Sequence, residues 1–476
     1  MTETQRDNRL PRNQKATLKQ NKNFRPAILL VVLALLGGVL FRCTKHQGVR
    51  DQARRPNIIL IGLDALRADH LGIYGYSKET SPQIDAFAQQ SVVFDTAISQ
   101  AAWTTPSFMS LLTSLYPSVH KLMEYPNPGQ LDDNIISWPV LMKAEGYLTA
   151  SFNGGGYLSG KFGFDRGFDH FVSGQMYYKN APRLFRDALA WIGRQQDQPF
   201  FLFLHTYSVH RPYWPPPVYR TRFFLESETE IDHTFSLPPR EWDHWQDRIK
   251  AGRIDGEDIR KITALYDAEI SYVDEAFGRF IQELKLSGVF DRSVIILTAD
   301  HGDELFDHGQ IDHIRTVYQE LIHVPLIIKI PGAAPERIQG WMESIDIMPT
   351  ILELIGLDCP AVQGESMLKA INKGKMLRTY AFSEGGKKGS IKALLSREWK
   401  YIYDTSTQTE ELYHLLKDPA ESQNLVRDYQ RVRENMRTHL QRILSANAEL
   451  SKNYVQRTVD LDKDLKRKLR SLGYLR

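Results

Sequence analysis

Apolar residues along the chain form short continuous runs that are separated by stretches with a helical period. The runs have the length and composition of buried β-strands. They are residues 57–63, 91–97, 200–205, 294–299 and 324–330. Residues 265–284 instead carry apolar side chains at every third or fourth position, as in an amphipathic helix. Strands that alternate with helices over this length predict an α/β fold, with a parallel or mixed sheet covered by helices on both faces.

The pattern changes around residue 375. Short β-like runs such as residues 400–403 follow, and a charged helical pattern then continues to the chain end. We therefore predict a main domain over residues 56–375 and a smaller α+β subdomain with a helical tail over residues 376–476.

The first apolar run of the chain, residues 26–41, differs from the others because an arginine flanks each end and many basic residues precede it. Snorkelling arginines can extend such a run to the ~17–25 residues that span a bilayer, and the basic flank favours a cytoplasmic N-terminus. A cleavable signal peptide or a buried core helix fits these flanks less well. We predict a cytoplasmic tail (1–25), a transmembrane signal anchor (26–42) and a linker (43–55). The remaining chain would lie at the cell inner membrane, in the periplasm or outside the cell.

Composition narrows the classes of partner. The chain has 476 residues with 60 basic and 57 acidic side chains, and its net charge of +3 is too small for a nucleic-acid-binding surface. Its two cysteines, Cys43 and Cys359, provide neither a disulfide framework nor a thiolate metal site. The composition is otherwise that of a folded protein with a large core.

Three polar residues directly follow two of the predicted strands. Asp64 comes after residues 57–63, and Asp300 and His301 come after residues 294–299. Binding crevices of open α/β sheets lie at the carboxyl ends of the strands, so we expect these side chains to lie close together. Carboxylates and an imidazole suit one divalent cation, and calcium, manganese, magnesium and zinc are all compatible with this set. A single aspartate at a strand end is more often a helix cap, so the second strand end and His301 are what favour a metal site.

The segment from Trp103 to Ser107 predicts a helix start, with Thr105 at the N-cap and Pro106 in the first helical position. Backbone N–H groups and the helix dipole at such an end attract a phosphate or sulfate group. The Thr104 hydroxyl, placed there beside a metal, could lose its proton and attack a bound ester. The signal is weak by itself because Thr-Pro opens many structural helices.

The candidate site residues named so far belong to longer sequence segments that occur in a fixed order along the chain. They are residues 57–75, 104–113, 200–205, 210–213, 298–303, 308–313 and 324–328. In this order the segments resemble the sulfatase branch of the alkaline-phosphatase superfamily, from residue 56 to about residue 425. The resemblance implies an alkaline-phosphatase-like fold, in which a mixed, mostly parallel sheet lies between helical layers and a smaller C-terminal α+β subdomain follows. The ligands that it implies for one divalent cation are Asp64, Thr104, Asp300 and His301.

Three positions depart from the sulfatase pattern. Thr104 stands where sulfatases carry the cysteine or serine that matures to formylglycine, Phe108 replaces an arginine of the same motif, and Ala65 replaces a second aspartate. Threonine cannot be converted to the aldehyde. Superfamily members with a threonine nucleophile, such as phosphodiesterases, lipoteichoic-acid-synthase-like enzymes and phosphoethanolamine transferases, pass through a phospho-threonine. The resemblance therefore indicates chemistry at phosphorus.

The resemblance also implies roles for several histidines. His210 matches the histidine that contacts the ester oxygens or the leaving group, and His313 falls where sulfatases often place an anion-holding lysine. Both are candidate general acids. Lys161 and His308 are weaker candidates for substrate contact, and Lys161 fits a surface lysine equally well. The histidines for which we expect only structural roles are His120, His205 and His323.

Together these features predict a membrane-anchored, metal-dependent hydrolase or transferase. Its substrate would be a small-molecule, lipid or glycan ester, either of the phosphate type (phosphodiester or phosphonate) or a sulfate, attacked by Thr104. Two alternatives stay open. One is a true sulfatase that works without formylglycine, and the other is a binding protein of the same fold that has lost its chemistry through the changes at Ala65 and Phe108.

Overall fold

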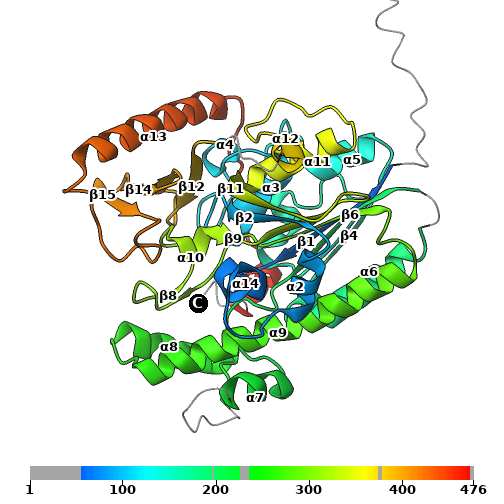
Figure 1. Cartoon of the computed structure of the whole chain (residues 1–476), viewed down its shortest axis with the longest axis horizontal. Helices are drawn as coiled ribbons and strands as arrows, with labels where there is room; N and C mark the ends of the chain where they lie inside the picture. The colour runs from blue at the N-terminus through cyan, green and yellow to red at the C-terminus, as the bar shows by residue number, and fades with distance from the viewer. Residues whose placement is uncertain (1–54, 196–197, 226–234, 374–377, 472–476) are drawn as a thin grey trace, which may run out of the picture. The chain divides into compact units, whose positions relative to one another are not determined.

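The computed structural model describes residues 55–195, 198–225, 235–373 and 378–471 (Figure 1). None of the helices in these ranges is long and apolar enough to cross a membrane. The predicted anchor, residues 26–42, lies outside the described residues, as do the predicted tail and most of the linker. The predictions of a transmembrane helix, a membrane partner and an inner-membrane localisation are therefore corrected, because no helix in the described part of the chain supports them.

Among the described residues, nine strands form one mixed sheet. From edge to edge it contains β11 (Glu336–Glu343), β2 (Val92–Ile98), β10 (Leu326–Lys329), β6 (Ser293–Thr298), β1 (Asn57–Leu63), β5 (Phe200–Thr206), β3 (Leu148–Asn153) and β4 (His170–Ser173), and β9 (His323–Val324) pairs with β2. Strand β1 is parallel to both of its neighbours, β5 and β6, whereas β10 is antiparallel to β2 and β6. The predicted mixed, mostly parallel sheet is confirmed.

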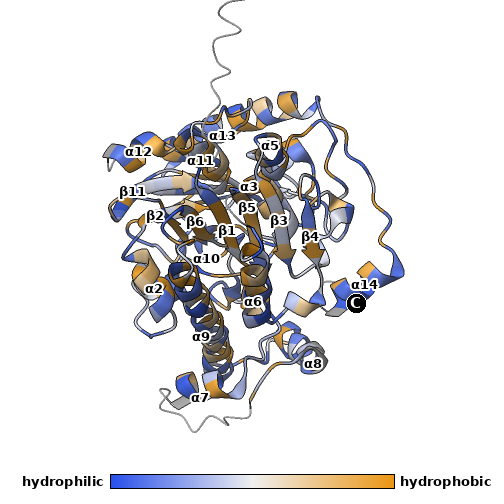
Figure 2. Cartoon of the chain, turned by 90° about the vertical axis from the view of Figure 1, so that its right-hand side faces the viewer, coloured by the Kyte–Doolittle hydropathy of each residue, from blue (hydrophilic) through white to orange (hydrophobic). Residues whose placement is uncertain are grey.

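Helices cover both faces of this sheet (Figures 1 and 2). One face carries α2 (Pro82–Ala88), α6 (Ala181–Ile192) and α9 (Gly256–Leu286), and the other carries α3 (Thr104–Thr113), α5 (Trp138–Ala144) and α11 (Ile347–Leu354). Further α-helices among the described residues are α4 (Pro117–His120), α7 (Pro217–Leu225), α8 (Pro239–Lys250), α10 (Gln319–Ile322), α12 (Leu368–Lys373), α13 (Gln430–Ser451) and α14 (Lys463–Ser471). Sheet and helices form the layered α/β arrangement that the alternating pattern predicts.

A smaller antiparallel sheet follows towards the C-terminus. It consists of β12 (Ala381–Gly385), β13 (Ile391–Leu395), β14 (Trp399–Asp404) and β15 (Thr409–His414). Helix α13 (Gln430–Ser451) packs against β13 and β14 (Figure 1). A short hairpin of β7 (Glu304–Leu305) and β8 (Ile311–Asp312) stands apart from both sheets. The C-terminal subdomain that the sequence predicts is therefore present.

The local sequence explains how these elements form. Every residue of β1 is buried, as expected of a central strand that helices cover on both faces, which is why its sequence is continuously apolar. Helix α9 begins after Asp255, whose side chain accepts hydrogen bonds from the N–H groups of Glu257 and Asp258, both at 2.9 Å. This N-cap satisfies two donors that would otherwise lack partners at the helix start.

The predicted strand at residues 324–330 is interrupted by a proline. Val324 ends β9 and Leu326 starts β10, with Pro325 between them. Proline has no N–H to donate to a neighbouring strand, so the ladder breaks there and resumes one residue later. The run is thus two short strands, and both pair with β2.

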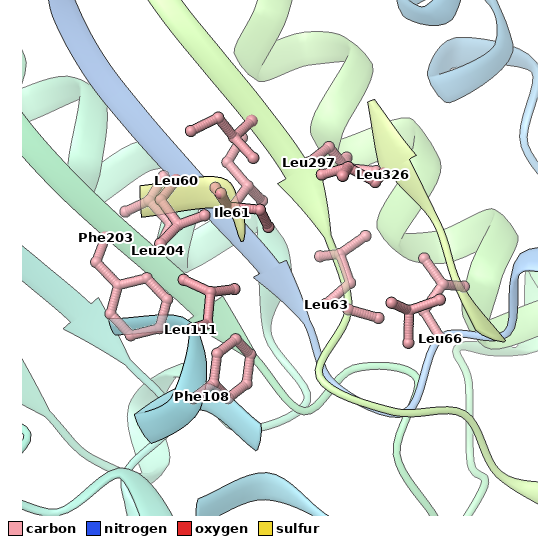
Figure 3. Packing of buried hydrophobic residues seen from close by; sticks show 14 of the residues in the cluster. Leu60, Ile61, Leu63, Leu66, Phe108, Leu111, Phe203, Leu204, Leu297 and Leu326 are labelled. Carbon is pink, nitrogen blue, oxygen red and sulfur yellow. The ribbon is translucent and has the colours of Figure 1, made fainter. Parts of the chain in front are cut away.

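Phe108 fixes helix α3 against the sheet. Its ring packs edge-on against the ring of Phe203 in β5, at a centroid distance of 5.5 Å (Figure 3). A Cβ at Gly62 of β1 would lie only 2.5 Å from the Phe108 ring. The helix and the central strand can therefore approach closely only because Gly62 has no side chain.

The Gly62→Ala substitution should lower the free energy of unfolding by about 1–3 kcal/mol, because the new methyl group overlaps the Phe108 ring in a closely packed core. Gly256→Ala, at the first residue of α9, is the control: apart from its chain neighbours and its own helix backbone, the nearest described heavy atom to its Cβ is at the far end of the Arg260 side chain, 3.6 Å away. Its stability should stay the same or rise. Urea unfolding followed by circular dichroism measures both variants, and wild-type stability of Gly62→Ala would contradict the packing argument.

Candidate active site

Asp64, Asp300 and His301 lie side by side at the carboxyl ends of two neighbouring strands. Asp64 follows β1, Asp300 and His301 follow β6, and the pairing of Gly62 with Thr298 keeps the two strand ends level. All three side chains are fully buried, and one ligand atom from each lies within 4.8 Å of the others. The parallel register of β1 and β6 therefore assembles this cluster.

One polar atom of each residue has no hydrogen-bond partner among the described residues, namely Asp64 Oδ1, Asp300 Oδ2 and His301 Nε2. His301 Nδ1 donates to the Gly302 carbonyl at 2.7 Å, which leaves the lone pair on Nε2. That nitrogen lies 3.3 Å from Asp300 Oδ2 and 3.9 Å from Asp64 Oδ1. Buried oxygen and imidazole atoms that converge in this way suit a divalent cation, so the residues fit the cofactor that the resemblance implies.

Burial raises the pKa of both carboxyl groups, to about 7 for Asp64 and to about 7 for Asp300. The Asp64 charge adds to the shift at Asp300, because two carboxylates in one buried space repel each other. Burial opposes protonation of His301, but the charges of Asp300 and Asp64 outweigh it and raise the pKa of this histidine. The cluster thus concentrates negative charge that a bound cation would neutralise.

Thr104 brings its hydroxyl to the same cluster. It is the first residue of α3, and its Oγ1 donates a hydrogen bond to Asp64 Oδ2 at 3.3 Å. The prediction placed the helix start two residues too late: Trp103, not Thr105, is the N-cap. The Thr105 hydroxyl instead donates to the Tyr157 carbonyl at 2.8 Å. The candidate nucleophile therefore lies at the N-terminus of a 10-residue helix, where the dipole favours an anion.

The turn after Asp64 is held in a left-handed conformation. Ala65 has a φ of +60°, its N–H donates to Asp300 Oδ1 at 3.2 Å, and its carbonyl accepts from the Tyr266 hydroxyl at 2.7 Å. The Tyr266 oxygen, on α9, also accepts from the Arg67 N–H at 2.9 Å. The position that the resemblance gives to a second aspartate thus contributes backbone groups, and these link the two strand ends.

His205 belongs to this site, although the sequence analysis gave it only a structural role. It lies near the end of β5, where it pairs with Gly62, and its Nε2 donates to Asp64 Oδ2 at 3.0 Å. Burial lowers the pKa of His205 to about 3, so the ring is neutral and donates an uncharged N–H. One sequence signal could have identified His205. If the strands that contain residues 57–63 and 200–205 are parallel neighbours with level ends, a histidine at the end of the second strand lies beside Asp64.

His210 and His313 form a pair of imidazoles beside the cluster. Their ring centroids are 5.0 Å apart, and the His313 ring lies 4.4 Å from that of His301. His313 Nδ1 lies 3.1 Å from Asp303 Oδ1, and His210 Nδ1 donates to the Arg211 carbonyl. Burial lowers the pKa of both rings well below the usual histidine value. The structure therefore brings both predicted histidines to the His301 side of the site as neutral rings.

Further polar residues surround His313. The Tyr213 hydroxyl donates to Asp303 Oδ2 at 2.5 Å, and Arg211 forms an ion pair with Asp312. Asp303, Asp312 and His313 offer a second group of ligand atoms within 4.8 Å of one another. Asp303 and Asp312 fall inside the recognised motifs but were not among the predicted site residues. The Arg211 charge offsets the charge of Asp312, which distinguishes this group from the one at Asp64.

Lys161 and His308 have partners of their own. Lys161 forms an ion pair with Asp462, just before α14. His308 Nδ1 lies 2.8 Å from Glu320 Oε1, and its ring stacks on Tyr318 at a centroid distance of 3.7 Å. These contacts give neither residue a role in the cluster at Asp64.

Two family models match the chain. A model described as Sulfatase matches residues 56–357, and one described as N-sulphoglucosamine sulphohydrolase, C-terminal, matches residues 306–446. The first match covers more than half of the chain. The chain belongs to the sulfatase family.

Individual proteins are also similar to this chain. N-acetylglucosamine-6-O-sulfatase of Bacteroides thetaiotaomicron is 24% identical over 498 residues, which cover 84% of this chain and 87% of the relative. The multifunctional alkaline phosphatase superfamily protein PehA of Trinickia caryophylli is 27% identical over 405 residues. The alignment covers 67% of this chain and 78% of PehA. The crystal structure of the phosphonate monoester hydrolase of Agrobacterium radiobacter superposes with a TM-score of 0.69 and 22% identity, over 83% of this chain and 96% of that one.

These comparisons confirm two of the predictions. The alkaline-phosphatase-like fold with a C-terminal antiparallel subdomain is that of the family's solved structures. The chain is an ester hydrolase of the sulfatase family.

A divalent cation such as Mn²⁺ or Ca²⁺ should stabilise the chelator-treated protein, by about 2.7 kcal/mol at a hundredfold excess over Kd, because only the folded chain assembles the ligands. Asp300→Asn should remove this gain. Asp358→Asn, at an exposed position, is the matched control and should keep it. Differential scanning fluorimetry measures the change in Tm, and a gain that persists in Asp300→Asn would place the cation elsewhere.

The contact between His308 and Glu320 predicts that the free energy of unfolding depends on pH. Although burial opposes protonation, Glu320 raises the pKa of His308 to about 9, against ~6.5 in the unfolded chain. The stabilisation is therefore present below pH ~6.5 and is lost as the pH rises through about 9. In His308→Gln, the fall in the free energy of unfolding between these pH values should be smaller by about 1–2 kcal/mol. This is less than the free energy equivalent to the full pKa difference, because the imidazole is partly exposed to solvent.

Urea unfolding between pH 6 and pH 10, the range that spans both pKa values, tests this dependence. Glu320→Gln should give the same flattened profile as His308→Gln, since either substitution breaks the pair. A decline as steep in His308→Gln as in the wild type would show that another group causes it.

Proposed function

We propose that this member of the sulfatase family cleaves or transfers phosphate-type esters, with Thr104 as the nucleophile. The observation that carries the proposal is the 3.3 Å hydrogen bond from Thr104 Oγ1 to Asp64 Oδ2, beside buried ligand atoms that have no partner among the described residues. A free hydroxyl is a weak nucleophile at neutral pH and needs an activating neighbour. The cluster of Asp64, Asp300 and His301 would be the activating neighbour of the Thr104 hydroxyl.

Asp64, Asp300 and His301 would hold one divalent cation, with Thr104 as a fourth ligand. When bound, such a cation supplies Lewis-acid stabilisation of the ester oxygens and favours the ionised form of a nearby hydroxyl. The N-terminus of α3 adds a dipole that favours the negative charge of the bound ester. His205 holds Asp64 in place through its 3.0 Å hydrogen bond and leaves the other carboxylate oxygen for the cation.

The proposed reaction balances with the residues of the site. Thr104 Oγ1 forms a bond to phosphorus, the bond from phosphorus to the leaving-group oxygen breaks, and the hydroxyl proton passes to that oxygen. His210 and His313 are suited to relay this proton, because each ring uses Nδ1 on a neighbouring oxygen and keeps the lone pair on Nε2. Water, or an acceptor alcohol in a transfer, then takes the phosphoryl group and restores the hydroxyl of Thr104.

Two observations support phosphorus as the reacting atom. Threonine cannot form the aldehyde of formylglycine, whereas phosphoryl transfer needs only a positioned hydroxyl and charge stabilisation. Proteins named for such chemistry, the phosphonate monoester hydrolase and the alkaline-phosphatase-superfamily protein PehA, are among the similar proteins. We therefore favour phosphodiesters or phosphonates of small molecules, lipids or glycans.

A glycan sulfate ester is the second candidate. The family model and the relative named N-acetylglucosamine-6-O-sulfatase favour it, and Thr104 would then accept a sulfuryl group in the same geometry. The third reading, a binding protein without activity, is less favoured because three ligand residues and the hydroxyl are assembled and buried.

Thr104→Ala should lower kcat for the preferred ester by roughly a thousandfold or more, because the nucleophile is removed. Thr104→Ser keeps a hydroxyl and should retain measurable turnover. The assays compare an aryl phosphodiester, an aryl phosphonate monoester and an aryl sulfate, and circular dichroism checks that both variants fold.

Mass spectrometry of acid-quenched wild-type protein should find one phosphoryl or sulfuryl group on the peptide that contains Thr104. The mass of that group decides between phosphorus and sulfur. Turnover at the wild-type rate in Thr104→Ala would exclude this nucleophile, and no turnover of any of the three esters by the wild type would favour the binding-protein reading.

A further inference from the structure

The short hairpin of β7 and β8 brings an aspartate to one of the histidines of the proposed reaction (Figure 1). The hairpin pairs Glu304 with Asp312 in antiparallel register. The same register places Asp303, the residue before β7, opposite His313, the residue after β8. His313 Nδ1 lies 3.1 Å from Asp303 Oδ1, and both side chains are buried. The fold of the hairpin therefore builds this contact.

The other carboxylate oxygen of Asp303 has a partner as well. The fully buried Tyr213 donates its hydroxyl proton to Asp303 Oδ2 at 2.5 Å. A carboxylate only accepts hydrogen bonds, so Oδ1 accepts the proton of His313 Nδ1. A neutral imidazole with its proton on Nδ1 carries its lone pair on Nε2. The contact with Asp303 thus selects the tautomer that a proton relay by His313 requires.

The backbone of Asp303 is fixed by Arg67, which lies in the segment that follows Asp64. The Arg67 guanidinium donates to the Asp303 carbonyl at 3.3 Å and to Asp307 Oδ2 at 2.7 Å. The Arg67 side chain is only 5% exposed, so water competes little for these bonds. The Arg67 N–H is held in turn by the Tyr266 hydroxyl. Asp303 is therefore tied to the same support as the turn after Asp64.

Asp303, Asp312 and His313 could also be interpreted as ligands of a second cation, because one ligand atom of each lies within 4.8 Å of the others. Their contacts favour a hydrogen-bonded pair instead. Asp303 accepts from Tyr213, and the charge of Asp312 is offset by the ion pair with Arg211. Little negative charge is left that a divalent cation would neutralise.

We propose that Asp303 is a positioning residue that holds His313 in the tautomer with the proton on Nδ1, so that Nε2 can accept and release the proton of the reaction. The inference rests on the proposed function and adds the residue that sets the state of one relay histidine. Asp303 acts through His313, and Tyr213 and Arg67 keep it in place.

The Asp303→Asn variant tests the tautomer directly. Its amide oxygen would accept from Tyr213, so its NH₂ group would face His313 Nδ1 and the ring proton should move to Nε2. Nitrogen-15 NMR of the histidine-labelled whole chain with Mg²⁺ distinguishes the two tautomers, and the spectrum of His313→Gln assigns the signal. We expect the proton on Nδ1 in the wild type and on Nε2 in Asp303→Asn.

Asp187→Asn is the matched control. Asp187, on α6, also accepts a tyrosine hydroxyl, that of Tyr177 at 3.1 Å, and takes no part in the site. This variant should keep the wild-type tautomer of His313 and the wild-type kcat. Tyr213→Phe should also keep the tautomer, because Asp303 Oδ1 still accepts.

Steady-state kinetics provide the second readout. Asp303→Asn should lower kcat about tenfold or more and change KM by less than about threefold, because the proton relay acts in the transition state. Asp303→Asn combined with His313→Gln should be no slower than His313→Gln alone, since Asp303 acts through that ring. A purely structural role would instead give losses that multiply.

The proposal would be overturned by a wild-type His313 with its proton on Nε2, whether or not Asp303→Asn folds. An unchanged tautomer in Asp303→Asn or multiplying losses in the double variant would also overturn it. So would a second bound cation in the wild type that Asp303→Asn loses, counted by elemental analysis of the dialysed protein. The expected tautomers without turnover of any ester would instead contradict the proposed function and leave the role of Asp303 in placing the proton standing.

Discussion

Two buried carboxylates held side by side are the constraint on which the rest of the site depends. Because β1 and β6 are neighbouring parallel strands, Asp64 and Asp300 emerge at the same height, away from bulk water. Lost hydration raises the pKa of each carboxyl group to about 7, and the charge of Asp64 adds to the shift at Asp300. A divalent cation with His301 as a third ligand would offset both the lost hydration and the repulsion, in keeping with the metal site that we propose.

The residues around this pair control its geometry. Tyr266 holds the left-handed turn at Ala65 through the Ala65 carbonyl, Ser107 donates to the Asp300 carbonyl at 2.6 Å, and His205 donates to Asp64. These bonds come from α9, α3 and β5, so elements on both faces of the sheet meet at the ends of β1 and β6. Loss of the second aspartate at position 65 therefore does not leave the turn unsupported, because backbone groups take over the link between the strands.

Much of the fold could be predicted from the chain itself, because a buried parallel strand needs a continuous apolar run and ends at a polar residue. Because Asp64 and Asp300 directly follow such apolar runs, the sequence also indicated these two residues as candidates for the site. It did not indicate a site role for His205, because that role depends on the register of β5 with β1. Nor could it foresee that Lys161 pairs with Asp462, since contacts between segments so distant in the sequence exist only once the chain is folded.

The environment of Phe108 bears on why threonine can be the nucleophile. In the motif that this sequence resembles, an arginine occupies this position beside the aldehyde. Here the ring is fully buried, packs on Phe203 and His205, and fills the space above Gly62. A guanidinium in so dry a space would need an anionic partner, and a neutral threonine hydroxyl supplies none. The apolar replacement therefore accords with the proposed Thr104 nucleophile, and it leaves charge stabilisation to the metal ligands, the helix N-terminus and the paired histidines.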